Sequence, residues 1–133
     1  MWLQKQIQLG ARGRGFHLIT DEVLQKFPEI GSAKGGLAHF LLQHTSASLS
    51  LNENADSSVR RDMESHFNQM APENAAYYEH TFEGADDMPA HIKSSLMQTH
   101  LSIPIENNQM VLGTWQGVYI FEHRNKSHNR KIK

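Results

Sequence analysis

The sequence predicts an α+β fold. Predicted strands come in pairs separated by helices, and the chain ends in a run of strands. That order is typical of α+β proteins and differs from the strand–helix alternation of a doubly wound sheet. The 133 residues are expected to form one domain, 1–133, which is long enough to bury a core. No repeat, low-complexity tract or linker divides the chain.

The first half of the chain predicts three strands and one helix. Polar and apolar residues alternate through 2–9, as in an amphipathic strand, and 16–19 follows as a second strand. Thr20 is expected to cap a short helix that ends at Pro28 and a glycine-rich loop. The nearly all-apolar run 37–42 predicts a strand that is buried on both faces.

The second half predicts two further helices and the closing strands. Apolar residues recur at four-residue spacing through 55–67, which indicates a helix that ends before Pro72. A second apolar stripe marks a short helix over 88–96, with a proline in its first turn. The remaining strands are predicted at 101–105, 110–112, 118–121 and 128–133, with an Asn-Asn turn between the first two.

Composition excludes several classes of protein. The formal net charge of −1 gives no reason to expect binding to nucleic acid or to an anionic membrane. The chain has no cysteine, which excludes disulfides, zinc ribbons and thiol catalysis. The mean hydropathy is −0.56, and no apolar run has the length of a signal peptide or a membrane span. We therefore expect a soluble cytoplasmic protein without nucleic-acid or membrane partners.

Three histidines in the middle of the chain, His44, His80 and His91, are the strongest candidates for a functional site. They stand among hydroxyl and carboxyl side chains, and such a set binds a divalent metal or moves protons near neutral pH. No His-Glu-x-x-His motif is present, so a zinc or magnesium site would have to be assembled in space. A single histidine is also commonly structural, and the segment with His80 and His91 also reads as a polar surface turn followed by a capped helix.

Two carboxylates, Glu53 and Asp56, are candidates for acid–base chemistry beside this site. They lie three residues apart, so that one face at the start of a helix could present both. The alternative is that they only complement the helix dipole. A serine hydrolase is a weaker interpretation, because Ser46 and Ser48 lack the Gly-x-Ser-x-Gly context of a nucleophile elbow.

Ligand-binding candidates lie in three other places. Thr45 and Ser46 offer hydroxyls directly after His44. In the run 113–117 two glycines flank a Trp and a Gln, which indicates a bulge or a close backbone approach. There Trp115 could stack on a flat ligand and Gln116 could hydrogen-bond to it, although a core or interface role for the Trp is also open. Arg124 and Arg130 could hold a phosphate, or serve only as edge-strand charges.

Four motifs follow one another along the chain: His44-Thr45-Ser46-Ala47-Ser48, Asn52-Glu53-Asn54-Ala55-Asp56, the stretch from Tyr78-Glu79-His80 through Gly84-Ala85-Asp86-Asp87-Met88-Pro89 to His91-Ile92-Lys93-Ser94-Ser95, and Gly113-Thr114-Trp115-Gln116-Gly117. In this order they resemble the YjbQ-like family, whose members are also called secondary thiamine-phosphate synthase enzymes. The resemblance extends over essentially the whole chain. It implies a compact domain of mixed, mainly antiparallel strands with two to three helices, which assembles as a homotrimer.

The same resemblance implies a function. A weak thiamine-phosphate synthase activity is expected, in which a pyrimidine pyrophosphate is joined to a thiazole phosphate and pyrophosphate is released. His44, His80 and His91 match family positions that we assign to a metal or acid–base site, and Glu53, Asp56 and Arg130 also fall on motif positions. A metal-dependent hydrolase of a phosphorylated metabolite and a non-catalytic trimer that binds a small anion or metal remain alternatives.

The chain departs from the family pattern at two positions. Ala55 stands where relatives carry a cysteine, so a mechanism that needs a thiol there cannot operate in this chain. Thr99-His100 replaces a Gly-Ser pair that often follows the second predicted helix of the second half, and we expect this change to alter only a turn.

Overall fold

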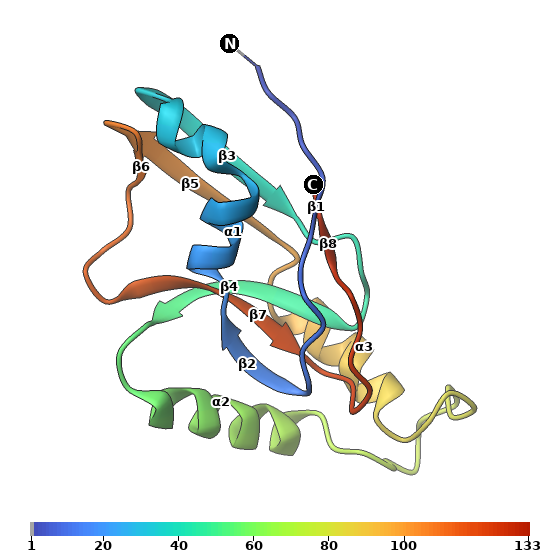
Figure 1. The fold of residues 1–133 in the computed structure, drawn as a ribbon. Coiled ribbons are helices and arrows are strands. Elements are labelled where there is room, and N and C mark those ends of the chain that lie inside the picture. Colours follow the sequence, from blue (N-terminus) through green and yellow to red (C-terminus); the bar gives the residue numbers. More distant parts are fainter. Residues whose placement is uncertain (1) are drawn as a thin grey trace.

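Three antiparallel sheets and three α-helices make up the computed structural model, which describes residues 2–133 (Figure 1). The helices are α1 (Thr20–Lys26), α2 (Ser57–Met70) and α3 (Asp87–Leu96), with a 3-10 turn, η1 (Pro28–Ser32), after the first. The strands are β1 (Ile7–Gln8), β2 (Gly15–Leu18), β3 (Gly35–Leu41), β4 (Ala47–Glu53), β5 (His100–Glu106), β6 (Gln109–Met110), β7 (Gln116–Glu122) and β8 (Lys131–Ile132). The predicted α+β class is confirmed.

The sheets have the orders β2-β7-β4, β3-β5-β6 and β1-β8, and isolated bridges connect them. Leu49 of β4 pairs with Gln98 just before β5, and Leu42 after β3 pairs with Ile132 of β8. The main core includes apolar residues from all three sheets and from α1, with Val23, Leu49 and Ile120 wholly buried. Burial of these side chains is the principal force that holds the sheets together.

Helix α2 lies below the β2-β7-β4 sheet and α3 lies beside its end (Figure 1). Met63 and Phe67 of α2 pack against a second apolar cluster, formed by Phe16, Tyr119 and Phe121. Strand β7 thus buries one set of side chains in the main core and the alternate set between the sheet and α2. A strand enclosed in this way needs apolar residues at successive positions, as the run 118–121 has.

Several expected elements occur with changed limits or roles. The Asn-Asn turn is confirmed, with φ of 51° at Asn107 and 66° at Asn108. Thr20 begins α1 and does not cap it, because its hydroxyl accepts a hydrogen bond from the Val118 amide at 2.8 Å. The strands expected over 2–9 and 128–133 are shorter in the structure, where β1 and β8 contain two residues each.

The prediction that 37–42 is buried on both faces is wrong. Ala38 and Phe40 face the core, whereas the side chains of Leu37 and Leu41 are 63% and 43% exposed. The β3-β5-β6 sheet therefore has an open outer face in the described chain. Because the outward residues of β3 are also apolar, the sequence of this strand resembles that of a strand enclosed on both faces. No helix within residues 2–133 has both the length and the apolar character that crossing a membrane requires.

Candidate metal centre

Three potential metal-binding side chains come together at the start of α3: His80, Asp87 and His91. Asp87 and His91 are one helical turn apart, so they project from the same face of α3. His80 belongs to the segment between α2 and α3, which folds back over that face. One ligand atom from each residue lies within 4.8 Å of the other two. We call these residues the ligand trio.

The ligand atoms converge on one carboxylate oxygen. Oδ2 of Asp87 lies 2.5 Å from Nε2 of His80 and 3.3 Å from Nε2 of His91. The side chain of Asp87 is only 2% exposed, whereas about a third of each imidazole is accessible. The trio therefore opens to solvent on the side of its histidines and is closed behind its carboxylate.

Neighbouring groups fix the orientation of the trio. Nδ1 of His91 lies 2.9 Å from the Thr45 carbonyl oxygen, which can only accept a hydrogen bond, so Nδ1 carries the proton and Nε2 keeps its lone pair. Arg124 donates from Nη1 to Oδ1 of Asp87 at 2.5 Å and from Nε to Oδ2 of Asp86 at 2.9 Å. Oδ2 of Asp87 is left facing the imidazoles. Hydrogen bonds of this kind commonly orient metal ligands.

The carboxyl of Asp87 is held in its charged form. Burial alone raises its pKa, but hydrogen bonds from neighbouring side chains, that of His80 first, and the positive charge of Arg124 outweigh burial and hold the pKa below its usual value. Asp86 is likewise kept ionised, because hydrogen bonds from the Asn125 amide and Arg124 lower its pKa against the effect of burial. A carboxylate that is ionised at neutral pH is a competent metal ligand.

The donor set fits a borderline transition metal better than magnesium. Two imidazole nitrogens and one carboxylate oxygen make a ligand set that zinc accepts, with further positions open to water. Magnesium prefers oxygen ligands throughout and retains several waters. Of the two metals expected from the sequence, the residues therefore favour zinc.

His44 does not belong to the trio, and Asp87 takes the place expected for it. Nε2 of His44 accepts a hydrogen bond from the Lys131 amide at 2.8 Å, so this lone pair is already in use. Burial, followed by the positive charge of Arg130, lowers the pKa of His44 and leaves the ring neutral at neutral pH. The four-residue spacing between Asp87 and His91 was the sequence signal that could have identified the missing ligand.

A cavity of about 750 Å³ adjoins the trio, because His91 is one of its lining residues. Its wall also contains His44, Thr45, Ser95, Gln98 and His100. Two of the three expected histidines, His44 and His91, thus share one cavity. His80 and His91 share the candidate metal site.

The carboxylates expected to assist catalysis lie outside the trio. Asp56 caps α2, because its Oδ1 accepts a hydrogen bond from the Ser58 amide at 2.8 Å, and this bond lowers its pKa. The carbonyl oxygen of Glu53 accepts a hydrogen bond from the hydroxyl of Tyr119. Oε2 of Glu53 is buried without a hydrogen-bond partner in the described chain. Asp56 thus serves the N-terminus of α2, which is the alternative to a catalytic role that the sequence left open.

Both candidate phosphate-binding arginines are engaged within the chain. Arg130 is 2% exposed and pairs with Glu122, which is equally buried, through Nη2 and Oε1 at 2.8 Å. It also donates from Nη1 to the hydroxyl of Ser46 at 3.1 Å. Arg124 binds the two aspartates at the start of α3 and, through Nη2, the Glu83 carbonyl at 2.8 Å. In this structure Ser46 contacts the buried Arg130–Glu122 pair, and Arg124 supports the trio.

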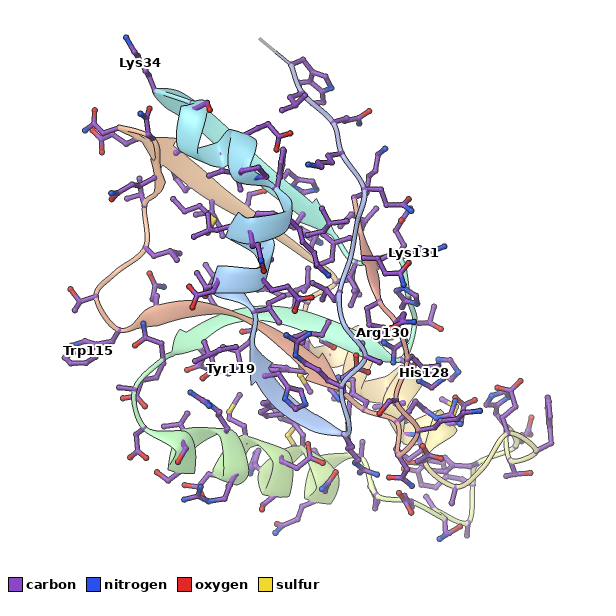
Figure 2. All side chains as sticks on the ribbon, viewed as in Figure 1. Lys34, Trp115, Tyr119, His128, Arg130 and Lys131 are labelled. Carbon is purple, nitrogen blue, oxygen red and sulfur yellow. The ribbon has the colours of Figure 1, made fainter. Side chains whose placement is uncertain are left out.

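The 113–117 segment forms a turn that leads into β7, the middle strand of its sheet. Trp115 is 66% exposed and points to solvent on the side of the molecule away from Arg130 (Figure 2). Gln116 folds back, and its Oε1 accepts a hydrogen bond from the Gly113 amide at 2.8 Å. The predicted close approach occurs at Gly117, where an added Cβ would lie 2.5 Å from Leu18 Cδ2. Trp115 is therefore neither a core residue of this chain nor close to the trio.

Comparisons with known proteins agree on one family. A family model described as "UPF0047 protein YjbQ-like" matches residues 5–133. The UPF0047 protein YjbQ of Salmonella typhimurium is 54% identical over 132 residues, which cover 99% of this chain and 95% of that protein. The protein of the same name from Escherichia coli O157:H7 is 52% identical over the same shares of both chains.

Solved structures show the same fold. A crystal structure of an uncharacterised conserved protein of the YjbQ/UPF0047 family from Clostridium acetobutylicum has a TM-score of 0.84 and 34% sequence identity. The match covers 98% of this chain and 97% of that one. A conserved hypothetical protein from Thermus thermophilus also gives a TM-score of 0.84, at 27% identity and the same coverage. The chain therefore belongs to the YjbQ-like UPF0047 family.

Proposed function

We propose that this protein is a divalent-metal-dependent enzyme that acts on a small phosphorylated metabolite. The observation that carries the proposal is the ligand trio, in which His80, Asp87 and His91 present three donor atoms within 4.8 Å of one another beside a cavity of about 750 Å³. An accessible donor set next to a cavity is the usual arrangement of a catalytic metal site, whereas structural sites are closed.

The reaction we propose is the one that the family resemblance implies, the joining of a pyrimidine pyrophosphate to a thiazole phosphate with release of pyrophosphate. A metal ion bound by the trio would supply positive charge for the departing pyrophosphate. The surrounding residues hold the trio in place: the Thr45 carbonyl orients His91, and Arg124 orients Asp87. No thiol takes part, because the chain contains no cysteine.

Trimeric assembly forms part of the proposal. It is supported by the outer face of the β3-β5-β6 sheet, where Leu37 and Leu41 are 63% and 43% exposed. Apolar residues on an open sheet face favour association with a second surface. Size-exclusion chromatography with light scattering should give three times the 15.2 kDa mass of one chain. A monomer at micromolar concentration would contradict this part of the proposal.

The enzymatic proposal is tested with protein that has been stripped by a chelator and reloaded with zinc or magnesium. Formation of thiamine phosphate is followed by chromatography of the two substrates and their product. We expect zinc to restore the synthesis, and His80→Ala to lose it. The matched control is His66→Ala, which changes an exposed histidine of α2 and should keep the activity.

The same preparations distinguish the alternatives. A hydrolase would release phosphate from a panel of phosphate esters in a zinc-dependent reaction and would form no thiamine phosphate. A binding protein would show a higher thermal midpoint with substrate or metal and no turnover of any substrate. Either result would contradict the synthase proposal, and only the second would contradict metal-dependent catalysis as well.

A further inference from the structure

The cavity next to the ligand trio has a chemical composition of its own. Its lining includes His44, His91 and His100 together with hydroxyl and amide side chains. It contains no carboxylate, lysine or arginine among the described residues. Such a wall offers hydrogen-bond donors without a negative charge that would repel an anion.

Helix α3 connects the cavity to the trio. His91, Ser94 and Ser95 occur at positions i, i+3 and i+4, so they lie on one face of the helix and all three line the cavity. The Ser94 hydroxyl is engaged, because it donates to the Ala47 carbonyl at 3.1 Å. The Ser95 hydroxyl is exposed and has no hydrogen bond within the described chain. A group bound at Ser95 would therefore be one helical turn from a metal ligand.

Thr45 is a second residue that contributes to both sites. Its carbonyl accepts the hydrogen bond from Nδ1 of His91 at 2.9 Å, and the residue also lines the cavity. Its hydroxyl makes no hydrogen bond within residues 2–133 and remains available to a ligand.

The hydrogen bond of His44 fixes its tautomer. A backbone amide can only donate, so Nε2 of His44 must be the acceptor of the 2.8 Å bond from Lys131. In a neutral imidazole the proton then resides on Nδ1. This N–H has no acceptor within the described chain, and the ring lines the cavity. His44 is thus a neutral donor with a fixed orientation.

We propose that the cavity binds the tetrahedral anionic group of the substrate, a phosphate, through Nδ1–H of His44 and the hydroxyls of Thr45 and Ser95. This inference rests on the proposed function, because the trio and the cavity would serve the same substrate. It gives His44 a role distinct from metal binding: this residue is a donor to the substrate and not a ligand of the ion.

The proposal is tested on the full-length protein without metal, so that its outcome does not depend on the trio. Inorganic phosphate is titrated into chelator-treated protein at constant ionic strength, and binding is followed by NMR of the amides and of ¹⁵N-labelled imidazoles. We expect chemical-shift changes at His44, Thr45 and Ser95, and a His44 ring with a protonated Nδ1. Shift changes confined to other surfaces, or a ring protonated on Nε2, would overturn the proposal.

Two substitutions separate loss of the donor from loss of the fold. His44→Asn keeps an N–H near the position of Nδ1 and should bind phosphate better than His44→Ala. We expect His44→Ala to weaken phosphate binding about ten- to a hundredfold, the usual effect of losing a hydrogen bond to a charged group. The control His66→Ala should bind as the wild type does. Equal phosphate affinity in His44→Ala and the wild type, with both folded by circular dichroism, would also overturn the proposal.

A zinc titration of the same variants keeps the two hypotheses distinguishable. His44→Ala should bind zinc with wild-type affinity, because His44 lies outside the trio. If His44→Ala weakens phosphate binding and zinc does not bind to any of the proteins, the proposed metal-dependent function is contradicted and the phosphate site is supported. If zinc binds and His44→Ala leaves the phosphate affinity unchanged, only the phosphate site is contradicted.

Discussion

The buried imidazole of His123 makes a specific prediction about stability in mild acid. His123 is 1% exposed, and its Nε2 lies 2.9 Å from the Ser48 hydroxyl oxygen. Its Nδ1 has no hydrogen-bond partner in the described chain. Burial is the main cause that lowers the pKa of His123 to about 3, and the positive charges of Lys93, Arg130 and Arg14 act in the same direction.

The sign of the effect follows from this depressed pKa. Above an ordinary histidine pKa of 6.5 the ring is neutral in both the folded and the unfolded chain, so its contribution to stability is fully present. As the pH falls from 6.5 toward 3, only the unfolded chain binds the proton, and the free energy of unfolding decreases. Between about pH 7.5 and about pH 5 the loss amounts to about 2 kcal/mol.

The assay is urea unfolding at these two pH values for the wild type and His123→Gln. Glutamine retains a polar group that can bond to Ser48 but does not titrate, so the variant should lose about 2 kcal/mol less than the wild type over the same interval. The comparison cancels the contributions of the other histidines and of the carboxylates. An equal loss in both proteins would refute the reasoning, because it would mean that His123 takes up its proton in the folded state.

Three further substitutions test the contacts described above. Arg130→Ala leaves the buried Glu122 carboxylate without its partner and should cost about 3–5 kcal/mol in urea unfolding; a loss below about 1 kcal/mol would contradict the buried pair. Gly117→Ala places a Cβ against Leu18 and should cost about 1–3 kcal/mol in the same assay, whereas an unchanged midpoint would show that the neighbours move freely. Asp56→Ala removes the cap of α2, so it should lower the thermal midpoint without changing zinc or phosphate affinity; altered zinc binding would restore the catalytic interpretation of Asp56.

The sequence predicted those elements whose signals are local. The four-residue spacing of apolar residues located α2, because Met63 and Phe67 face the aromatic cluster of the sheet. The turn at Asn107 was predictable because asparagine tolerates positive φ values. In contrast, the apolar run of β3 did not reveal whether its second face is covered, since Leu37 looks the same in sequence whether it is buried or exposed.

The site was predictable only in part, because its geometry depends on contacts that span the chain. The spacing of Asp87 and His91 was visible as one helical turn. Its significance depends on His80, which a loop brings back, and on Arg124, 37 residues away from Asp87. The backbone bond that removes His44 from the metal ligands comes from a residue 87 positions later. No local pattern carries such information.

Stoichiometric zinc binding tests the central claim most directly. The chelator-treated wild type should take up one zinc ion for each chain, measured by elemental analysis after titration and gel filtration. His80→Ala and His91→Ala should lose this ion while circular dichroism shows a retained fold, and His44→Ala should keep it. Zinc retained by both trio variants, or lost from His44→Ala, would contradict the assignment of the metal site to His80, Asp87 and His91.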